Sequence, residues 1–153
     1  IVNKFFEIIK PNYSFFGIKD FQQLCLIYRK LSSLHKTSII PVETVREPSG
    51  LACSSRNILL NHDQKALASK IYEGLKLLEE KIIEKPRINY INFLKDFYNS
   101  FNSIDIEYIF VEETSIFNES RKLITDLLGD KKTVIMVAAK VGKIRLIDNL
   151  LIR

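Results

Sequence analysis

Residues 1–45 alternate between two kinds of apolar pattern, and this alternation restricts the possible folds most strongly. Apolar residues recur at helical spacing in residues 1–9 and 19–34, whereas residues 13–17 and 38–45 are short and apolar, as buried strands are. The order helix, strand, helix, strand predicts a parallel α/β layer. Because two parallel strands are too few to be stable alone, we expect this segment to be the last portion of a larger sheet.

The remainder of the chain changes from helical spacing to strand alternation. Residues 46–57 are rich in Pro, Gly, Ser and Asn, which predicts a loop, and Asn61 followed by Gln64 resembles a helix N-terminal capping signal. We expect two amphipathic helices and three strands, at residues 61–85, 89–101, 104–110, 133–139 and 144–149. Helices followed by adjacent strands predict a small α+β domain with an antiparallel sheet, and hence two domains, 1–57 and 58–153.

Charge and composition exclude several classes of function. The net charge is +5, but Lys and Arg are scattered among Asp and Glu, so we expect no nucleic-acid partner. No apolar run approaches the roughly 20 residues that span a bilayer, so no membrane partner is expected. Cys25 and Cys53 form no metal-type pair, which favours reduced thiols in the cytoplasm. His35 and His62 have no ligand-type neighbours, so no metal site is predicted.

The first polar cluster follows the first predicted strand. Gly17 ends that strand and lets the backbone approach a ligand closely, and a helix N-terminus, which favours anions, follows at once. Lys19 adds a mobile charge suited to phosphate, Asp20 can accept hydrogen bonds from sugar hydroxyls, and Gln23 lies one turn further on. A capped helix with solvated Lys and Gln side chains is the alternative that these residues leave open.

The second polar cluster is the loop that follows the second predicted strand. Residues 44–57 read Thr-Val-Arg-Glu-Pro-Ser-Gly-Leu-Ala-Cys-Ser-Ser-Arg-Asn. Ser54, Ser55 and Arg56 could wrap a polyphosphate, because Ser hydroxyls and the Arg fork donate to phosphate oxygens. An ordinary interdomain loop is the alternative. Both clusters lie at the carboxyl ends of successive strands, where open α/β sheets bind ligands, so together they predict a nucleotide site.

These two segments resemble the pantothenate synthetase family in order and spacing. The resemblance lies in residues 17–23 (Gly-Ile-Lys-Asp-Phe-Gln-Gln), in the loop just described, and in the ending Gly-Lys-Ile-Arg-Leu-Ile-Asp-Asn at 142–149. It covers essentially the whole chain. It implies an α/β fold class, namely the C-terminal part of a Rossmann-like nucleotidyltransferase domain followed by an α+β lid domain.

The resemblance also implies a two-step ligase reaction. Pantoate attacks the α-phosphate of ATP to give pantoyl adenylate and pyrophosphate, and β-alanine then displaces AMP to give pantothenate. Lys19, Ser54, Ser55 and Arg56 would bind phosphates and carry the catalysis, which rests on charge neutralisation and alignment. Gly17 and Asp20 would hold the ribose, backbone groups of Val45 and Cys53 would face the adenine, and Gln23 would bind pantoate. Mg²⁺ is implied as the companion of ATP, and a homodimer as the state of the parent enzyme.

The sequence departs from the family pattern in several places. Ile18 replaces a usual Glu, Glu43 a common Pro, and Cys53 a larger apolar residue. The family's His-x-Gly-His motif and its second pantoate-binding glutamine are not among these 153 residues. We therefore expect the chain to be inactive alone. Two alternatives stay open, namely a non-catalytic fragment and another adenylate-forming nucleotidyltransferase with a different acid substrate.

Overall fold

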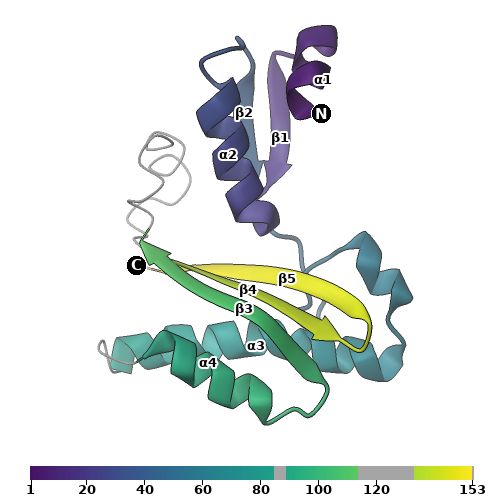
Figure 1. The fold of residues 1–153 in the computed structure, drawn as a ribbon, viewed down its shortest axis with the longest axis vertical. Coiled ribbons are helices and arrows are strands. Elements are labelled where there is room, and N and C mark those ends of the chain that lie inside the picture. Colours follow the sequence, from purple (N-terminus) through teal and green to yellow (C-terminus); the bar gives the residue numbers. More distant parts are fainter. Residues whose placement is uncertain (85–88, 114–132, 153) are drawn as a thin grey trace.

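The computed structural model describes residues 1–84, 89–113 and 133–152, and it contains two separate sheets (Figure 1). The first sheet pairs β1 (Tyr13–Gly17) with β2 (Ser38–Val42) in parallel, from Tyr13 opposite Ser38 to Gly17 opposite Val42. Helices α1 (Val2–Ile9) and α2 (Phe21–Leu31) accompany it. The predicted parallel α/β layer is therefore confirmed, and the carboxyl ends of both strands meet at one edge.

The second sheet is antiparallel and has the strand order β3-β4-β5. Its strands are β3 (Ile104–Glu113), β4 (Thr133–Val141) and β5 (Ile144–Ile152), all longer than the sequence predicted. Helices α3 (His62–Glu84) and α4 (Tyr90–Asn99) cover one face, as Figure 1 shows. At the start of α3, Asn61 and Gln64 exchange hydrogen bonds of 3.0 and 2.9 Å, which confirms the predicted capping signal.

The main core lies between the antiparallel sheet and its two helices. Leu75, Leu78 and Leu94 are fully buried there together with Tyr98. The Tyr98 hydroxyl donates a 2.7 Å hydrogen bond to the carbonyl oxygen of Ile71, so the buried ring brings its polar group to a partner. Burial also raises the pKa of Tyr98 far above its ordinary value.

A second core joins α2 to the opposite face of the same sheet. Phe21 and Leu24 of α2 pack with Val134 and Met136 of β4 and with Leu151 of β5. Successive residues of β4 thus serve different cores, because side chains of a strand alternate between its two faces. The start of α2 is thereby fixed against the antiparallel sheet.

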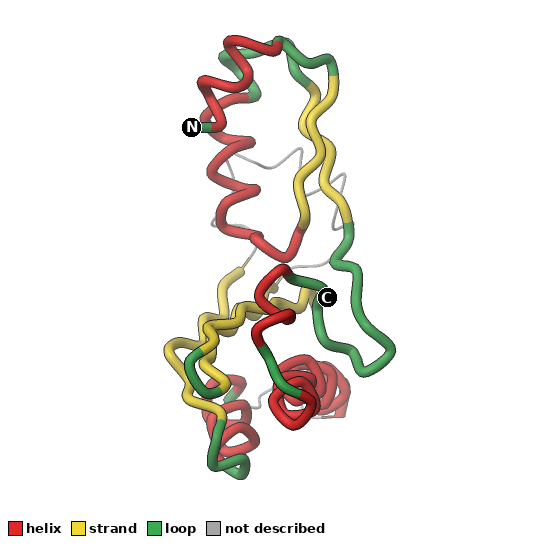
Figure 2. The backbone as a smooth tube through the Cα atoms, turned by 90° about the vertical axis from the view of Figure 1, so that its right-hand side faces the viewer, coloured by secondary structure: helices red, strands yellow, loops and turns green. Residues whose placement is uncertain are grey.

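The parallel sheet is less buried than the sequence predicted. Tyr13 and Phe15 are 65% and 67% exposed, so the prediction of a buried strand was wrong for this face of β1. Both helices lie on the same side of the two strands (Figure 2), and no other described element covers the opposite side. Phe5 and Phe110 are exposed as well. Cys25 is buried within the core that includes α2.

The helix predicted at residues 19–34 is shorter and begins differently. A 3₁₀ turn, η1 (Ile18–Asp20), precedes α2, and the α-helix ends at Leu31. The strand predicted at residues 38–45 ends at Val42, and residues 43–45 lead into the loop. Among the described residues, no helix is both long and apolar enough to cross a membrane.

Close packing between α3 and α4 gives a first testable prediction. A Cβ atom at Gly74 would lie 2.7 Å from Cδ1 of Phe97 and 2.8 Å from Cε1 of Tyr98. The Gly74→Ala substitution should therefore lower the free energy of unfolding by about 1–2 kcal/mol, since overpacking outweighs the better helix propensity of Ala. Urea denaturation of the variant measures the loss.

Gly17→Ala is the matched control, because no atom lies within 4 Å of a Cβ at that position and its φ of −67° suits any residue. Its free energy of unfolding should change by less than about 0.5 kcal/mol. Equal losses in both variants would contradict the packing explanation.

Candidate functional site

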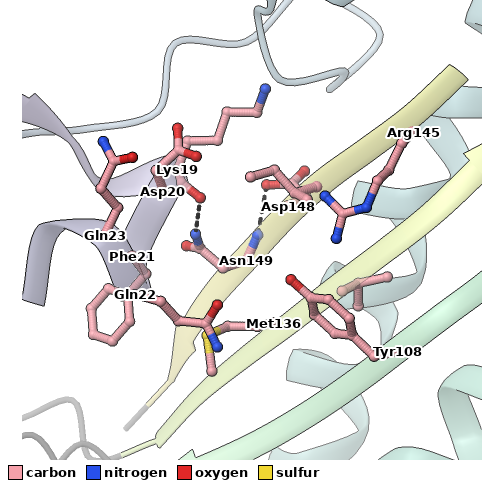
Figure 3. Close-up of a pocket in the computed structure, with 12 residues that line it drawn as sticks. Lys19, Asp20, Phe21, Gln22, Gln23, Tyr108, Met136, Arg145, Asp148 and Asn149 are labelled. Carbon is pink, nitrogen blue, oxygen red and sulfur yellow. Dashed lines mark hydrogen bonds between the residues drawn. The ribbon is translucent and has the colours of Figure 1, made fainter. Parts of the chain in front are cut away.

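A pocket of about 230 Å³ lies between the start of α2 and the antiparallel sheet (Figure 3). Residues 19–23 line one side, and residues of β3, β4 and β5 line the other, namely Tyr108, Met136, Val137, Arg145, Ile147, Asp148 and Asn149. The carboxyl end of β1 leads directly into it through η1. The first predicted cluster therefore lies where the parallel layer meets the second sheet.

Lys19 connects the two predicted clusters. Its Nζ donates a 3.4 Å hydrogen bond to the carbonyl oxygen of Cys53, which lies 34 positions further along the chain. Burial lowers the pKa of Lys19 from its ordinary 10.5, while the nearby carboxylates of Asp148 and Asp20 oppose this shift. Because the folded pKa is the lower one, the folded state gains stability as the pH rises through the window below 10.5. A bound phosphate would favour the charged form instead.

The other residues predicted in the first cluster, Gly17, Asp20 and Gln23, are exposed. Asp20 and Gln23 are exposed, line the pocket and come from the same end of α2 (Figure 3). Gly17 is exposed and has open space where a side chain would be. Its φ of −67° requires no glycine, so the room beside it, and not the backbone conformation, is what this residue provides.

The predicted loop at residues 46–57 is a tight hairpin followed by a 3₁₀ helix. Glu47 N donates to Leu51 O, and Gly50 N to Glu47 O, both at 2.8 Å, with Gly50 at a φ of +86°. Cys53 N donates to Val45 O at 2.9 Å, so these two backbone groups, predicted to face adenine, are paired with each other. The hairpin gives the second cluster a defined shape.

The polar end of this loop forms the turn η2 (Ser55–Leu59). Ser54 caps it, because its Oγ accepts from the backbone N–H of Arg56 at 3.3 Å. Ser55 and Arg56 are exposed. The Nη1 of Arg56 donates a 2.9 Å hydrogen bond to the carbonyl oxygen of Arg145 in β5. Arg56 thus reaches the same strand that lines the pocket.

Sequence reasoning did not assign a role to Arg46 or Asp148, which form an ion pair across 102 positions. Nη1 and Nη2 of Arg46 lie 2.6 and 2.9 Å from the two carboxylate oxygens of Asp148. The Arg46 guanidinium also stacks 3.5 Å from the ring centre of Tyr72. Both residues belong to motifs that carry the family resemblance, and this membership was the one sign in the sequence that they could be functional.

Asn149 also went unassigned from the sequence. Its Nδ2 donates to the carbonyl oxygens of Ile18 at 3.0 Å and Lys19 at 2.8 Å. Figure 3 shows Asn149 between the start of α2 and Asp148. Lys140 of β4 and Arg145 of β5 both pair with Glu107 of β3, and these two cations lower the pKa of that carboxyl group. The β5 strand therefore presents a sequence of polar contacts toward the pocket and the loop.

His35 and His62 take no part in these contacts. His35 Nε2 is 2.8 Å from Asn3 Oδ1 and packs edge-on against Phe6, and His62 is exposed at the start of α3. The thiol of Cys53 is free. Across residues 1–84, 89–113 and 133–152, no group of three or more His, Cys, Asp or Glu side chains could hold a metal ion.

A parallel α/β layer with a polar site at the carboxyl ends of its strands is typical of nucleotide-binding proteins. Comparison with known proteins defines the family. Residues 1–151 match the family described as pantoate-beta-alanine ligase, and the chain belongs to this family. The α/β fold class and the resemblance read from the sequence are thereby confirmed.

Individual relatives agree with this assignment. The chain is 36% identical to pantothenate synthetase of Coprothermobacter proteolyticus, over 99% of its own length and 53% of that protein. It is 38% identical to pantothenate synthetase of Acinetobacter baumannii, over 98% and 51% of the two chains. The chain thus spans about half the length of the curated relatives it matches.

Solved structures show the same relation. The crystal structure of pantothenate synthetase from Thermus thermophilus superposes with a TM-score of 0.80 at 26% identity, over 97% of this chain and 52% of that one. Pantoate-beta-alanine ligase from Francisella tularensis, complexed with beta-gamma ATP and beta-alanine, gives a TM-score of 0.70 at 31% identity. The match to this second structure covers 98% of this chain and 47% of that one.

The Arg46–Asp148 pair provides a second testable prediction. Because Asp148 is buried and both its oxygens meet Arg46, removing either partner alone should lower the free energy of unfolding by about 3 kcal/mol. The double variant Arg46→Ala/Asp148→Ala should lose clearly less than the sum of the two single losses. Urea denaturation of the four proteins in this cycle measures the coupling.

The exposed pair Lys70–Glu73 is the matched control, since its side chains are 35% and 45% exposed. Its coupling should be about 0.5 kcal/mol or less. A coupling between Arg46 and Asp148 as small as this one would show that the buried pair has no special structural importance.

Proposed function

We propose that residues 1–153 form the C-terminal half of an ATP-dependent ligase that condenses pantoate with β-alanine. Pantoyl adenylate is the intermediate, and AMP, pyrophosphate and pantothenate are the products. Family membership supports this proposal, and so does the ATP and β-alanine complex of the Francisella relative. Residues 1–57 would complete the nucleotide-binding domain, and residues 58–153 would be its lid domain.

The observation that carries the proposal is the contact between the two strand-end segments. Lys19 reaches the backbone of Cys53, which directly precedes Ser54, Ser55 and Arg56. Lys19 therefore lies beside the loop that carries the two Ser hydroxyls, and it is close enough to Arg56 for the two charges to interact. We assign the phosphates of ATP to Lys19, Ser55 and Arg56, with Ser54 holding the turn that presents them.

The remaining substrate contacts follow from the same placement. Asp20 is exposed next to Gly17 and would accept hydrogen bonds from the ribose, while backbone groups of Val45 and Cys53 would border the adenine. Gln23 lies one helical turn beyond Asp20, where its amide would hold the pantoate carboxylate or hydroxyl groups. β-Alanine would attack the acyl carbon once the adenylate occupies this position.

Mg²⁺ fits the proposal as an ion that ATP brings with it. Both oxygens of Asp148 bond to Arg46, so of the two described carboxylates that line the pocket, Asp20 is the exposed one. Such a site suits an ion held mainly by phosphate oxygens and water. Its chemical contribution when bound would be to neutralise charge on the phosphates.

The uncovered side of β1 supports the view that other residues complete the domain. Tyr13 and Phe15 expose large aromatic side chains beside a sheet of two strands, which is too small to be stable alone. The matching relatives are about twice as long as this chain. The proposal also includes the homodimer that the family resemblance implies and a cytoplasmic location, where ATP is available.

Two alternatives remain distinct from this proposal. Another adenylate-forming enzyme would use a different acid, whereas a non-catalytic fragment would use none. Exchange of pyrophosphate into ATP, measured with each of a panel of acids in turn, separates them. Exchange with pantoate but with no other acid supports the ligase. Exchange with a different acid would mean that Gln23 does not bind pantoate.

Lys19 and Arg56 provide the third testable prediction. Both would meet negative charge that moves toward pyrophosphate as the adenylate forms, so they should act mainly on the first step. In the full-length enzyme, Lys19→Ala or Arg56→Ala should slow adenylate formation by roughly 10²-fold or more. Aminolysis of supplied pantoyl adenylate should be less affected, because no β- or γ-phosphate is present. Lys19→Arg should rescue only partly.

Rapid-quench measurement of the two half-reactions distinguishes the outcomes. Lys36→Ala is a matched control, because Lys36 is an exposed lysine outside the pocket and the loop, and it should leave both steps unchanged. Unchanged adenylate formation in the Lys19 and Arg56 variants would remove both residues from the site. Equal slowing of the two steps would indicate a misfolded loop.

A further inference from the structure

The side chain of Asn149 is bonded to the backbone that carries Lys19. Asn149 is 6% exposed, and its Nδ2 donates to two successive carbonyl oxygens, those of Ile18 and Lys19. These carbonyls belong to η1, the turn between β1 and α2. A strand from the end of the chain therefore fixes the turn at the start of the pocket.

The neighbouring side chain of Asp148 is bonded to the other segment of the proposed ATP site. Asp148 holds Arg46, and Arg46 also donates a 3.1 Å hydrogen bond to the carbonyl oxygen of Gly50 at the tip of the hairpin. The two β5 residues are joined directly as well, because the backbone N–H of Asn149 donates to Asp148 Oδ1 at 2.8 Å. One dipeptide thus connects η1 with the loop.

Neither residue has a polar donor group directed to a ligand. Both oxygens of Asp148 accept from Arg46, and the Asn149 amide nitrogen bonds to two protein carbonyls. The bidentate pair of Arg46 with Asp148, and the Asn149 amide that donates to two carbonyl oxygens, fix the orientation of the bonded groups as well as their distance. These contacts suit residues that position other groups rather than residues that touch substrate.

We propose that Asp148 and Asn149 of β5 are positioning residues. They hold the two segments of the ATP site, namely the turn that carries Lys19 and the hairpin loop, in a fixed position relative to each other. The proposal rests on the ATP site described above. The two residues have separate roles, since Asn149 orients the turn before α2 and Asp148 orients the loop through Arg46. Loss of either should misplace phosphate-binding groups, and a displacement of about 1 Å can slow a reaction on the order of 10²-fold.

Hydrogen exchange of the full-length enzyme tests the positioning without any assay of activity. Asn149→Asp keeps the size of the side chain but places a carboxylate oxygen against two carbonyl oxygens. It should speed exchange of the amides in residues 24–27, whose helical acceptors are the carbonyls of residues 20–23 next to the turn, roughly 10-fold more than in residues 28–31. Asp148→Asn should instead speed exchange of the hairpin amides of Glu47, Gly50 and Cys53.

Ile152→Ala is the control for general loss of stability, because Ile152 is a buried β5 residue of the main core. It should speed exchange evenly along α2. The separate positioning roles would be disproved if Asn149→Asp gave the same even pattern as Ile152→Ala. They would also be disproved if Asn149→Asp and Asp148→Asn affected the same segment.

The full-length enzyme tests whether this positioning serves the ATP site. Both variants should slow adenylate formation by at least about 10-fold while changing aminolysis of supplied pantoyl adenylate much less. Equal slowing of the two steps, or none, would overturn the inference. If the unmodified full-length protein showed no pantoate-dependent exchange of pyrophosphate into ATP, the proposed function would be refuted. The hydrogen-exchange pattern of the variants would not be affected by that result.

Discussion

The ion pair between Arg46 and Asp148 is the interaction on which the arrangement of the site depends. It joins the first residue of the hairpin loop to β5 with two hydrogen bonds, in a partly buried setting against the Tyr72 ring. Removing one partner would leave a charge without its counterpart, which is far more costly than never having the pair. Through Asn149, the same strand also fixes the turn that carries Lys19.

The antiparallel sheet connects this polar network to the rest of the molecule. One face of β4 contributes to the core with α3 and α4, and its other face contributes to the core with α2. A strand buried on both faces has little freedom to shift, since a slip by one residue would exchange the two sets of side chains. The start of α2 and the turn before it are therefore held against this sheet both by apolar packing and by the hydrogen bonds of Asn149.

Local elements were predictable because each depends on neighbouring residues. Helical spacing located α3 and α4, and the reciprocal bonds of Asn61 and Gln64 are a local signal. The exposure of Tyr13 and Phe15 was not predictable, because an apolar strand does not reveal which of its faces is covered. Arg46–Asp148 joins residues 102 positions apart, and no spacing rule reaches that far. Only the motifs shared with the family marked these residues together.

We propose that residues 1–153 are half of a ligase whose ATP site needs the other half to work. Pantoate-dependent exchange of pyrophosphate into ATP tests it most directly, in residues 1–153 alone and in the full-length enzyme at equal concentrations. We expect exchange by the full-length enzyme and a rate at least about 10³-fold lower for residues 1–153, because several preorganised charge stabilisers would be absent. Comparable rates in the two proteins would contradict the account.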